Sequence, residues 1–137
     1  DSTGVLTLAG KNFPAHQGNN NDIDASKLTI KGGSNNTYTL SSDDVDILSS
    51  TSASISLNNT DQSSLDSLLN NNGDISSQGT TYNISAANRW IKGSDSSINN
   101  EDLSGNGITV YNNVNRSYGN FRRSLRIVGR WIIFKHL

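Results

Sequence analysis

An antiparallel β-sandwich with one short helix is the fold class that this chain of 137 residues predicts, on three observations. Roughly four residues in ten are Ser, Asn or Thr, which suits strands with polar outer faces joined by tight turns. Apolar residues make up 32 %, enough for one thin core. They are grouped in short runs that alternate with polar residues, the pattern of a strand with one buried face.

Short alternating runs bounded by glycine, asparagine and serine predict about seven strands. Turn residues between them predict two hairpins, one around residues 32–36 and one around residues 49–52. A helical turn over residues 86–90 would anchor Trp90 in the core. The predicted strands are residues 4–10, 27–31, 37–40, 45–48, 53–57, 80–84 and 107–111.

One helix is predicted over residues 61–70, between the second hairpin and the sixth strand. Thr60 suits the N-cap, and Asp61 suits the positively polarised first turn. Gly73 is a natural left-handed stop after the last turn. Short strands interrupted by one such crossover are typical of antiparallel sandwiches of the immunoglobulin-like kind. Leucines at helical spacing form one apolar face: Leu65, Leu68 and Leu69.

Charge divides the chain into two parts. Residues 1–113 contain all twelve acidic residues and five basic ones, a net charge of −7. Residues 114–137 contain six basic residues and no acidic one, a net charge of +6. We therefore expect residues 1–113 to form the β-sandwich and residues 114–137 to form a basic, aromatic tail. No apolar run reaches the roughly 18–20 residues of a transmembrane helix, so no membrane span is expected.

Residues suited to catalysis are scarce. The chain has no cysteine, its two histidines are His16 and His136, and no Gly-x-Ser-x-Gly sequence is present. A nucleophile needs a base that a third group holds in place, and neither histidine has such a neighbour in the sequence. Glu101 is the single glutamate, which leaves little for a two-carboxylate glycosidase. The sequence therefore predicts a protein that is not an enzyme.

The order of the runs also resembles a known kind of repeat. Residues 2–112 resemble one unit of the tandem immunoglobulin-like repeats of very large bacterial surface or secreted proteins, and residues 114–137 match no part of such a unit. In those arrays the stretch before the unit supplies a further strand, which this chain lacks. The segments that carry the resemblance are residues 2–13, 22–30, 37–40, 57–73, 79–87 with Trp90, and 102–110.

The resemblance implies a non-enzymatic structural or adhesive repeat module, or an assembly subunit, of an extracellular or cell-surface protein. Its expected partners are neighbouring repeats or further copies of the same protein. The absence of methionine suggests a processed chain or an excerpt of a longer one. The family has no established catalytic residues, so the resemblance assigns none here.

Two acidic clusters are candidates for a calcium site. Asp22 and Asp24 follow an asparagine tract, and clustered carboxylates and carbonyls can supply the six to eight oxygens that calcium takes. The second cluster contains Asp43, Asp44 and Asp46. Their negative charges repel one another unless a cation offsets the repulsion. The spacing is not that of an EF-hand, and the alternative is Asx-rich surface turns with no cofactor.

Aromatic residues leave a second function open. A carbohydrate-binding module needs exposed rings, and surface glycans would then be partners. Half-buried core positions are the alternative for the same rings, and Trp90 is assigned to the core. The aromatic residues in question are Tyr38, Tyr82, Trp90 and Tyr111.

The tail sequence has three interpretations. As a strand it would complete the sheet within the chain or pair with a neighbouring copy's open edge. As a helix it would place Phe121, Leu125, Val128 and Ile132 opposite several arginines. Nucleic-acid binding is disfavoured because the body is acidic. We favour the strand, whose apolar face alternates: Leu125, Ile127, Trp131 and Ile133.

Overall fold

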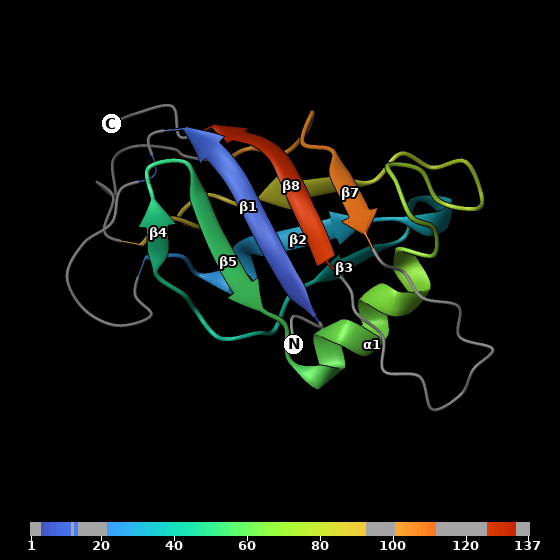
Figure 1. Cartoon of the computed structure of the whole chain (residues 1–137), viewed down its shortest axis with the longest axis horizontal. Helices are drawn as coiled ribbons and strands as arrows, with labels where there is room; N and C mark the ends of the chain where they lie inside the picture. Colours follow the sequence, from blue (N-terminus) through green and yellow to red (C-terminus); the bar gives the residue numbers. More distant parts are fainter. Residues whose placement is uncertain (1–3, 12, 14–21, 93–100, 112–125, 134–137) are drawn as a thin grey trace.

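The computed structural model describes residues 4–11, 13, 22–92 and 101–111, and the backbone of residues 126–133 (Figure 1). Most of its elements are strands, with one α-helix, so the β-rich prediction is confirmed. The strands are β1 (Val5–Lys11), β2 (Leu28–Lys31), β3 (Thr37–Thr39), β4 (Ile47–Ser49), β5 (Ser52–Ser56), β6 (Asn83–Ala86), β7 (Ile108–Tyr111) and β8 (Arg126–Ile133), and the helix is α1 (Asn59–Leu68).

The strands form two sheets. One has five strands in the order β4-β5-β1-β8-β7, and the other has three in the order β3-β2-β6. Both predicted hairpins are present, as the antiparallel pairs β2–β3 and β4–β5. In the described part of the chain every strand pair is antiparallel except β1–β8, which is parallel. Along the chain the strands change sheet repeatedly, so the loops between β3 and β4 and between β5 and β6 cross from one sheet to the other.

One hydrophobic cluster joins the two sheets. Alternation buries every second residue: Leu6 and Leu8 of β1 face inward, as do Ile30 of β2 and Ile84 of β6. Trp90 is fully buried in the same cluster, as predicted. The ring of Phe13 meets it edge-on, with ring centroids 5.9 Å apart and an interplanar angle of 83°. The thin core expected from the composition is thus shared by both layers.

The helix begins and ends earlier than predicted. Asn58, not Thr60, is the N-cap, because its side-chain oxygen accepts a 2.7 Å hydrogen bond from the backbone N–H of Asp61. The last helical residue is Leu68, and Leu69 caps the helix with its N–H bonded to the Leu65 carbonyl. Gly73 has a left-handed φ of 91°, but it lies beyond the helix and exchanges hydrogen bonds with Val110 of β7.

The sixth strand starts later than predicted, at Asn83 rather than at residue 80. A local turn takes up the preceding residues, because the Ser76 hydroxyl accepts from the backbone N–H groups of Gln78 and Thr80. Such side-chain bonds offer the backbone an alternative to the sheet ladder. The polar alternation around residue 80 resembles a strand in the sequence but belongs to this turn.

Part of the tail forms β8, which lies between β1 and β7 in the same chain (Figure 1). Ile127 aligns with Leu6 of β1 on one side and with Val110 of β7 on the other. The β1–β8 register shifts between Leu8 and Gly10, so the two-residue alternation assumed for the apolar face is interrupted there. Leu125 lies outside the described residues, and the helical alternative is wrong for Arg126–Ile133.

Gly32 allows a close approach between the first hairpin and α1. A Cβ added there would lie less than 3.0 Å from the backbone oxygen of Leu68, which cannot withdraw without moving the helix end. We expect Gly32→Ala to lower the free energy of unfolding by about 1–3 kcal/mol, measured by urea denaturation. Asn36→Ala, at an exposed position in the same turn, should change it by less than about 0.5 kcal/mol. Equal effects of the two substitutions would contradict this packing.

Candidate functional site

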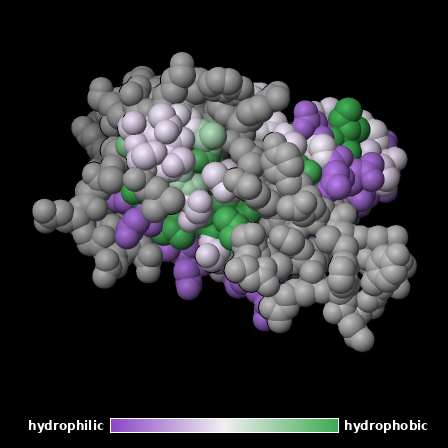
Figure 2. All heavy atoms as spheres, in the orientation of Figure 1, coloured by the Kyte–Doolittle hydropathy of each residue, from purple (hydrophilic) through white to green (hydrophobic). Residues whose placement is uncertain are grey.

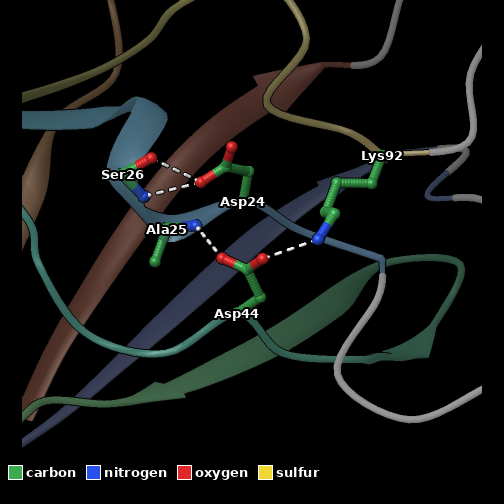
Figure 3. Close-up of polar contacts among 5 residues, drawn as sticks. All are labelled: Asp24, Ala25, Ser26, Asp44 and Lys92. Carbon is green, nitrogen blue, oxygen red and sulfur yellow. Dashed lines mark hydrogen bonds and ion pairs between the residues drawn. The ribbon is translucent and has the colours of Figure 1, made fainter.

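The carboxylates predicted to bind calcium lie around the start of β2. Asp24 caps a short 3₁₀ turn: its Oδ1 accepts from the N–H of Ser26 at 3.0 Å and from the Ser26 hydroxyl at 2.6 Å. Asp44 accepts from the N–H of Ala25 at 3.2 Å through Oδ1. Its Oδ2 lies 2.7 Å from Nζ of Lys92 (Figure 3). Both carboxylates therefore bind protein donors and join three segments of chain.

Asp22 has a different role from its neighbours. It is 1 % exposed, and its Oδ2 accepts a 2.8 Å hydrogen bond from the N–H of Ile47, the first residue of β4. Asp43 is exposed and Asp46 is half-buried. Among the described residues, no three Asp, Glu, His or Cys side chains are arranged to share a metal ion. A calcium site and Asx-rich turns with no cofactor both stay predictions, and the asparagine tract at residues 19–21 lies outside the described residues.

Lys92 supplies a positive charge to this region. The hydrogen bond and the charge of Asp44 raise the pKa of the Lys92 ammonium, and the charge of Asp24 adds to this. Lys92 therefore stays protonated well above neutral pH. Because its side chain is 40 % exposed, water and salt screen the pair. The contact therefore contributes little to the stability of the fold.

Asp61 accepts hydrogen bonds on both of its carboxylate oxygens. It is fully buried at the first turn of α1 and is surrounded by hydroxyl and amide donors from β3 and from the loop after β3. Charge-assisted bonds of this kind are stronger than neutral ones. Its donors are the Tyr38 hydroxyl at 2.6 Å, the Ser41 N–H at 3.0 and 2.9 Å, the Ser41 hydroxyl at 2.8 Å, the Ser42 N–H at 2.8 Å and the Ser42 hydroxyl.

These donors decide the charge of Asp61. Burial alone raises the pKa of the carboxyl, but hydrogen bonds from Ser42, Tyr38 and Ser41 outweigh burial and hold the pKa below its ordinary value of 3.8. Asp61 is therefore an anion at neutral pH. A carboxylate with a lowered pKa and with donors on both oxygens is poorly suited to general acid–base catalysis, which works best near the operating pH. Its chemistry suits a structural junction.

A second polar junction holds the segment before β7 against β6. Asn106 is 2 % exposed, and its Nδ2 donates to the carbonyls of Ile84 and Asp102 and to the Asp102 carboxylate. Its own N–H donates to the side chain of Asn83 at 2.9 Å. Backbone bonds between Ala86 and Asp102 extend the contact. The segment before β7 therefore pairs with the edge of β6 that faces away from β2.

The aromatic residues considered for glycan binding lie mostly inside. Trp90 and Tyr82 are fully buried, and burial raises the pKa of the Tyr82 phenol, whose oxygen bonds to the backbone of Asn71. Tyr38 is half-buried, with its hydroxyl on Asp61. The side chain of Tyr111 lies outside what the structure describes, as do His16 and His136.

Sequence reasoning found Asp61 as a first-turn acid but missed its role as a junction. The serines that donate to it precede it by about twenty positions, and no local pattern links them. Asn106 was missed for the same reason, since its bonds to Ile84 span 22 positions. An acid in a predicted first turn, together with a serine pair directly after a predicted strand, is the one signal that the sequence offers.

Comparisons with protein-family models, with curated proteins and with solved structures returned no match to this chain. In the described part of the chain no helix is both long and apolar enough to cross a membrane.

Replacing Asp61 tests the junction directly. At neutral pH we expect Asp61→Asn to lower the free energy of unfolding by about 2–4 kcal/mol, because it removes charge-assisted bonds and leaves buried donors without acceptors. Since folding lowers the pKa of Asp61, its contribution is present above 3.8 and is lost as the pH falls through the lower folded-state value. The gap between wild type and variant should therefore shrink in acid.

Urea denaturation of both proteins, from neutral pH to below pH 3.8, measures this gap. Asp43→Asn is the matched control, because it makes the same chemical change at an exposed position beside Ser42. The control should lose less than about 0.5 kcal/mol at neutral pH. A loss as large in the control as in Asp61→Asn would contradict the junction.

Calcium addition tests the acidic region. Asp24 and Asp44 already bind N–H donors and Lys92, so we expect that calcium does not raise the melting temperature of chelator-treated protein. A bound ion at a hundredfold excess over its Kd would stabilise the protein by about 2.7 kcal/mol. Magnesium at the same ionic strength is the control. A rise specific to calcium would show that these side chains rearrange to hold the ion.

Proposed function

We propose that this chain is a non-enzymatic structural module of a bacterial extracellular or cell-surface protein, serving as a spacer, an adhesive unit or an assembly subunit. One observation carries the proposal. The first and last strands of the described chain, β1 and β8, are parallel neighbours, with Val5 beside Arg126 and Lys11 beside Ile133. The chain therefore enters at one end of the sheet and leaves at the other, roughly 20 Å away along the strands.

Opposite entry and exit points suit a module that spans distance. Two antiparallel strands would bring entry and exit to the same end, and successive units would then have to turn back. With β1 and β8 parallel, force applied through the two ends runs along both strands in opposite directions. Every backbone hydrogen bond between them is then loaded together. This is the geometry expected of a spacer that bears tension.

The outer surface also suits a structural module. Along β1 and β5, inward-facing apolar residues alternate with partly exposed Thr7, Ser52 and Ser54. Figure 2 shows pale, nearly neutral residues over β4 and β5 on this face. The buried polar groups Asp61 and Asn106 are occupied by internal bonds. The polar side chains thus hold the fold together or cover its strands.

The proposal includes an immunoglobulin-like fold for the β-sandwich. Two sheets share one core, and the chain crosses between them several times, as in sandwiches of the immunoglobulin-like kind. We propose that residues 2–112 are one unit of the tandem bacterial repeats that their sequence resembles. The partners of such a unit are its neighbours in the array.

Single-molecule pulling tests the mechanical role. We expect a higher unfolding force when handles are attached to the two chain ends than when one handle is at the N-terminus and the other at Ser56→Cys. Ser56 pairs with Val5, so the second geometry opens the β1–β5 ladder one bond at a time. The chain has no cysteine, so the handle position is unique. Equal forces in the two geometries would refute a load-bearing role.

A further inference from the structure

β8 occupies an interior position in the five-stranded sheet. Its backbone aligns with β1 from Val5 to Lys11 on one side and with β7 from Ile108 to Tyr111 on the other. Removing β8 would leave two facing strand edges, each with a row of unpaired backbone groups. Such edges recruit another strand of suitable sequence. The slot between β1 and β7 is therefore a binding surface for a strand.

The connection to β8 is long for neighbouring antiparallel strands. Residues 112–125 separate β7 from β8, whereas hairpin loops usually contain about 2–5 residues. Fourteen residues can extend over at most roughly 46–50 Å, so this connection is long enough for β8 to reach a neighbouring copy. β8 is also the last described element, so it can leave its slot without breaking any other described strand pairing.

Charge favours an encounter between one copy's tail and another copy's body. Residues 114–137 carry a net charge of +6, and residues 1–113 carry −7. Opposite net charges raise the rate of encounter, although salt screens them within roughly 8–10 Å. Two bodies, or two tails, repel each other. The preferred contact between two copies is therefore tail to body.

We propose that the slot between β1 and β7 accepts the strand Arg126–Ile133 of a second copy of this chain. This inference deepens the assembly role within the proposed function. The incoming strand has the same sequence as the resident one, so it makes the same backbone bonds in the same register, and the exchange costs no interaction within the sheet. A reciprocal exchange gives a dimer, and a one-way exchange gives a chain of copies.

Concentration decides between the two arrangements. The β8 of the same chain, tethered by residues 112–125, has an effective concentration of about millimolar or below, because this value falls as the tether lengthens. Exchange between copies therefore becomes substantial when the protein approaches that concentration during folding, as it would where copies are crowded together. Once the strand is inserted, its release is slow because it must unpair from both β1 and β7.

Cysteine cross-linking distinguishes exchange from internal pairing. Val128 aligns with Thr7 of β1, and the chain contains no natural cysteine. Thr7→Cys protein and Val128→Cys protein are mixed in denaturant, refolded together from micromolar to about millimolar concentration, and treated with a short thiol cross-linker. We expect a covalent heterodimer joining positions 7 and 128, identified by mass spectrometry, whose yield rises at least several-fold over this range.

Two controls define the background. Thr39→Cys, exposed on β3 of the other sheet, replaces Thr7→Cys in the matched mixture and should give little product with Val128→Cys. The double variant Thr7→Cys/Val128→Cys, refolded when dilute, should cross-link within one chain. If a substitution prevents folding, Val5→Cys with Arg126→Cys is the second pair, because those positions also align.

A heterodimer yield no higher than that of the Thr39→Cys control at every concentration overturns the exchange. Failure of the double variant to cross-link within one chain would overturn it as well, since the slot itself would then be wrong. The first result leaves the proposed spacer role intact, because the pulling experiment depends on β8 pairing within one chain. The two proposals can therefore fail separately.

Discussion

The burial of one anion, Asp61, fixes two of the passages of the chain between its two sheets, the one after β3 and the one after β5. Ser41 and Ser42 lie directly after β3, where the chain leaves the three-stranded sheet for β4. Asn58 lies after β5, where the chain leaves the five-stranded sheet for α1, and its N–H donates to the Ser42 hydroxyl at 2.9 Å. Both crossings meet at the Asp61 carboxylate. A buried charge without donors is strongly unfavourable, so the loop and the helix must form this junction together.

Buried hydrogen bonds such as those of Asp61 explain how a chain with so few apolar residues can define one structure. The core is thin, and polar side chains do much of the positioning that a larger core would otherwise provide. Asn106 binds the segment before β7 to β6, and Ser76 closes the turn that precedes β6. The abundance of serine and asparagine is therefore partly structural. These side chains accept or donate at loop backbones that the sheet ladders leave unpaired.

The sequence predicts the elements whose signals are local and misses the contacts between residues that are distant in the chain. β2, β3 and β5 were predicted closely because period-two alternation is a local signal and the turns at residues 32–36 and 49–52 are explicit. The helix start was misplaced because Asn58 and Thr60 are both good caps, and the choice depends on whose side chain reaches Asp61. The Asp61 junction was missed because its donors are distant in sequence. No local pattern shows that α1 and the loop after β3 come together.

The position of β8 links the mechanical proposal to the exchange proposal. Because β1 and β8 are parallel neighbours, load applied in the proposed spacer role would run along both strands, and the five-stranded sheet is incomplete until β8 pairs. Contacts between Val5 and Arg126 close almost the whole described chain, and pairings over such separations are slow to form because loop-closure entropy opposes them. During that interval the slot between β1 and β7 is open. A spacer that gains strength from its final strand is therefore also one whose slot a neighbouring copy can enter first.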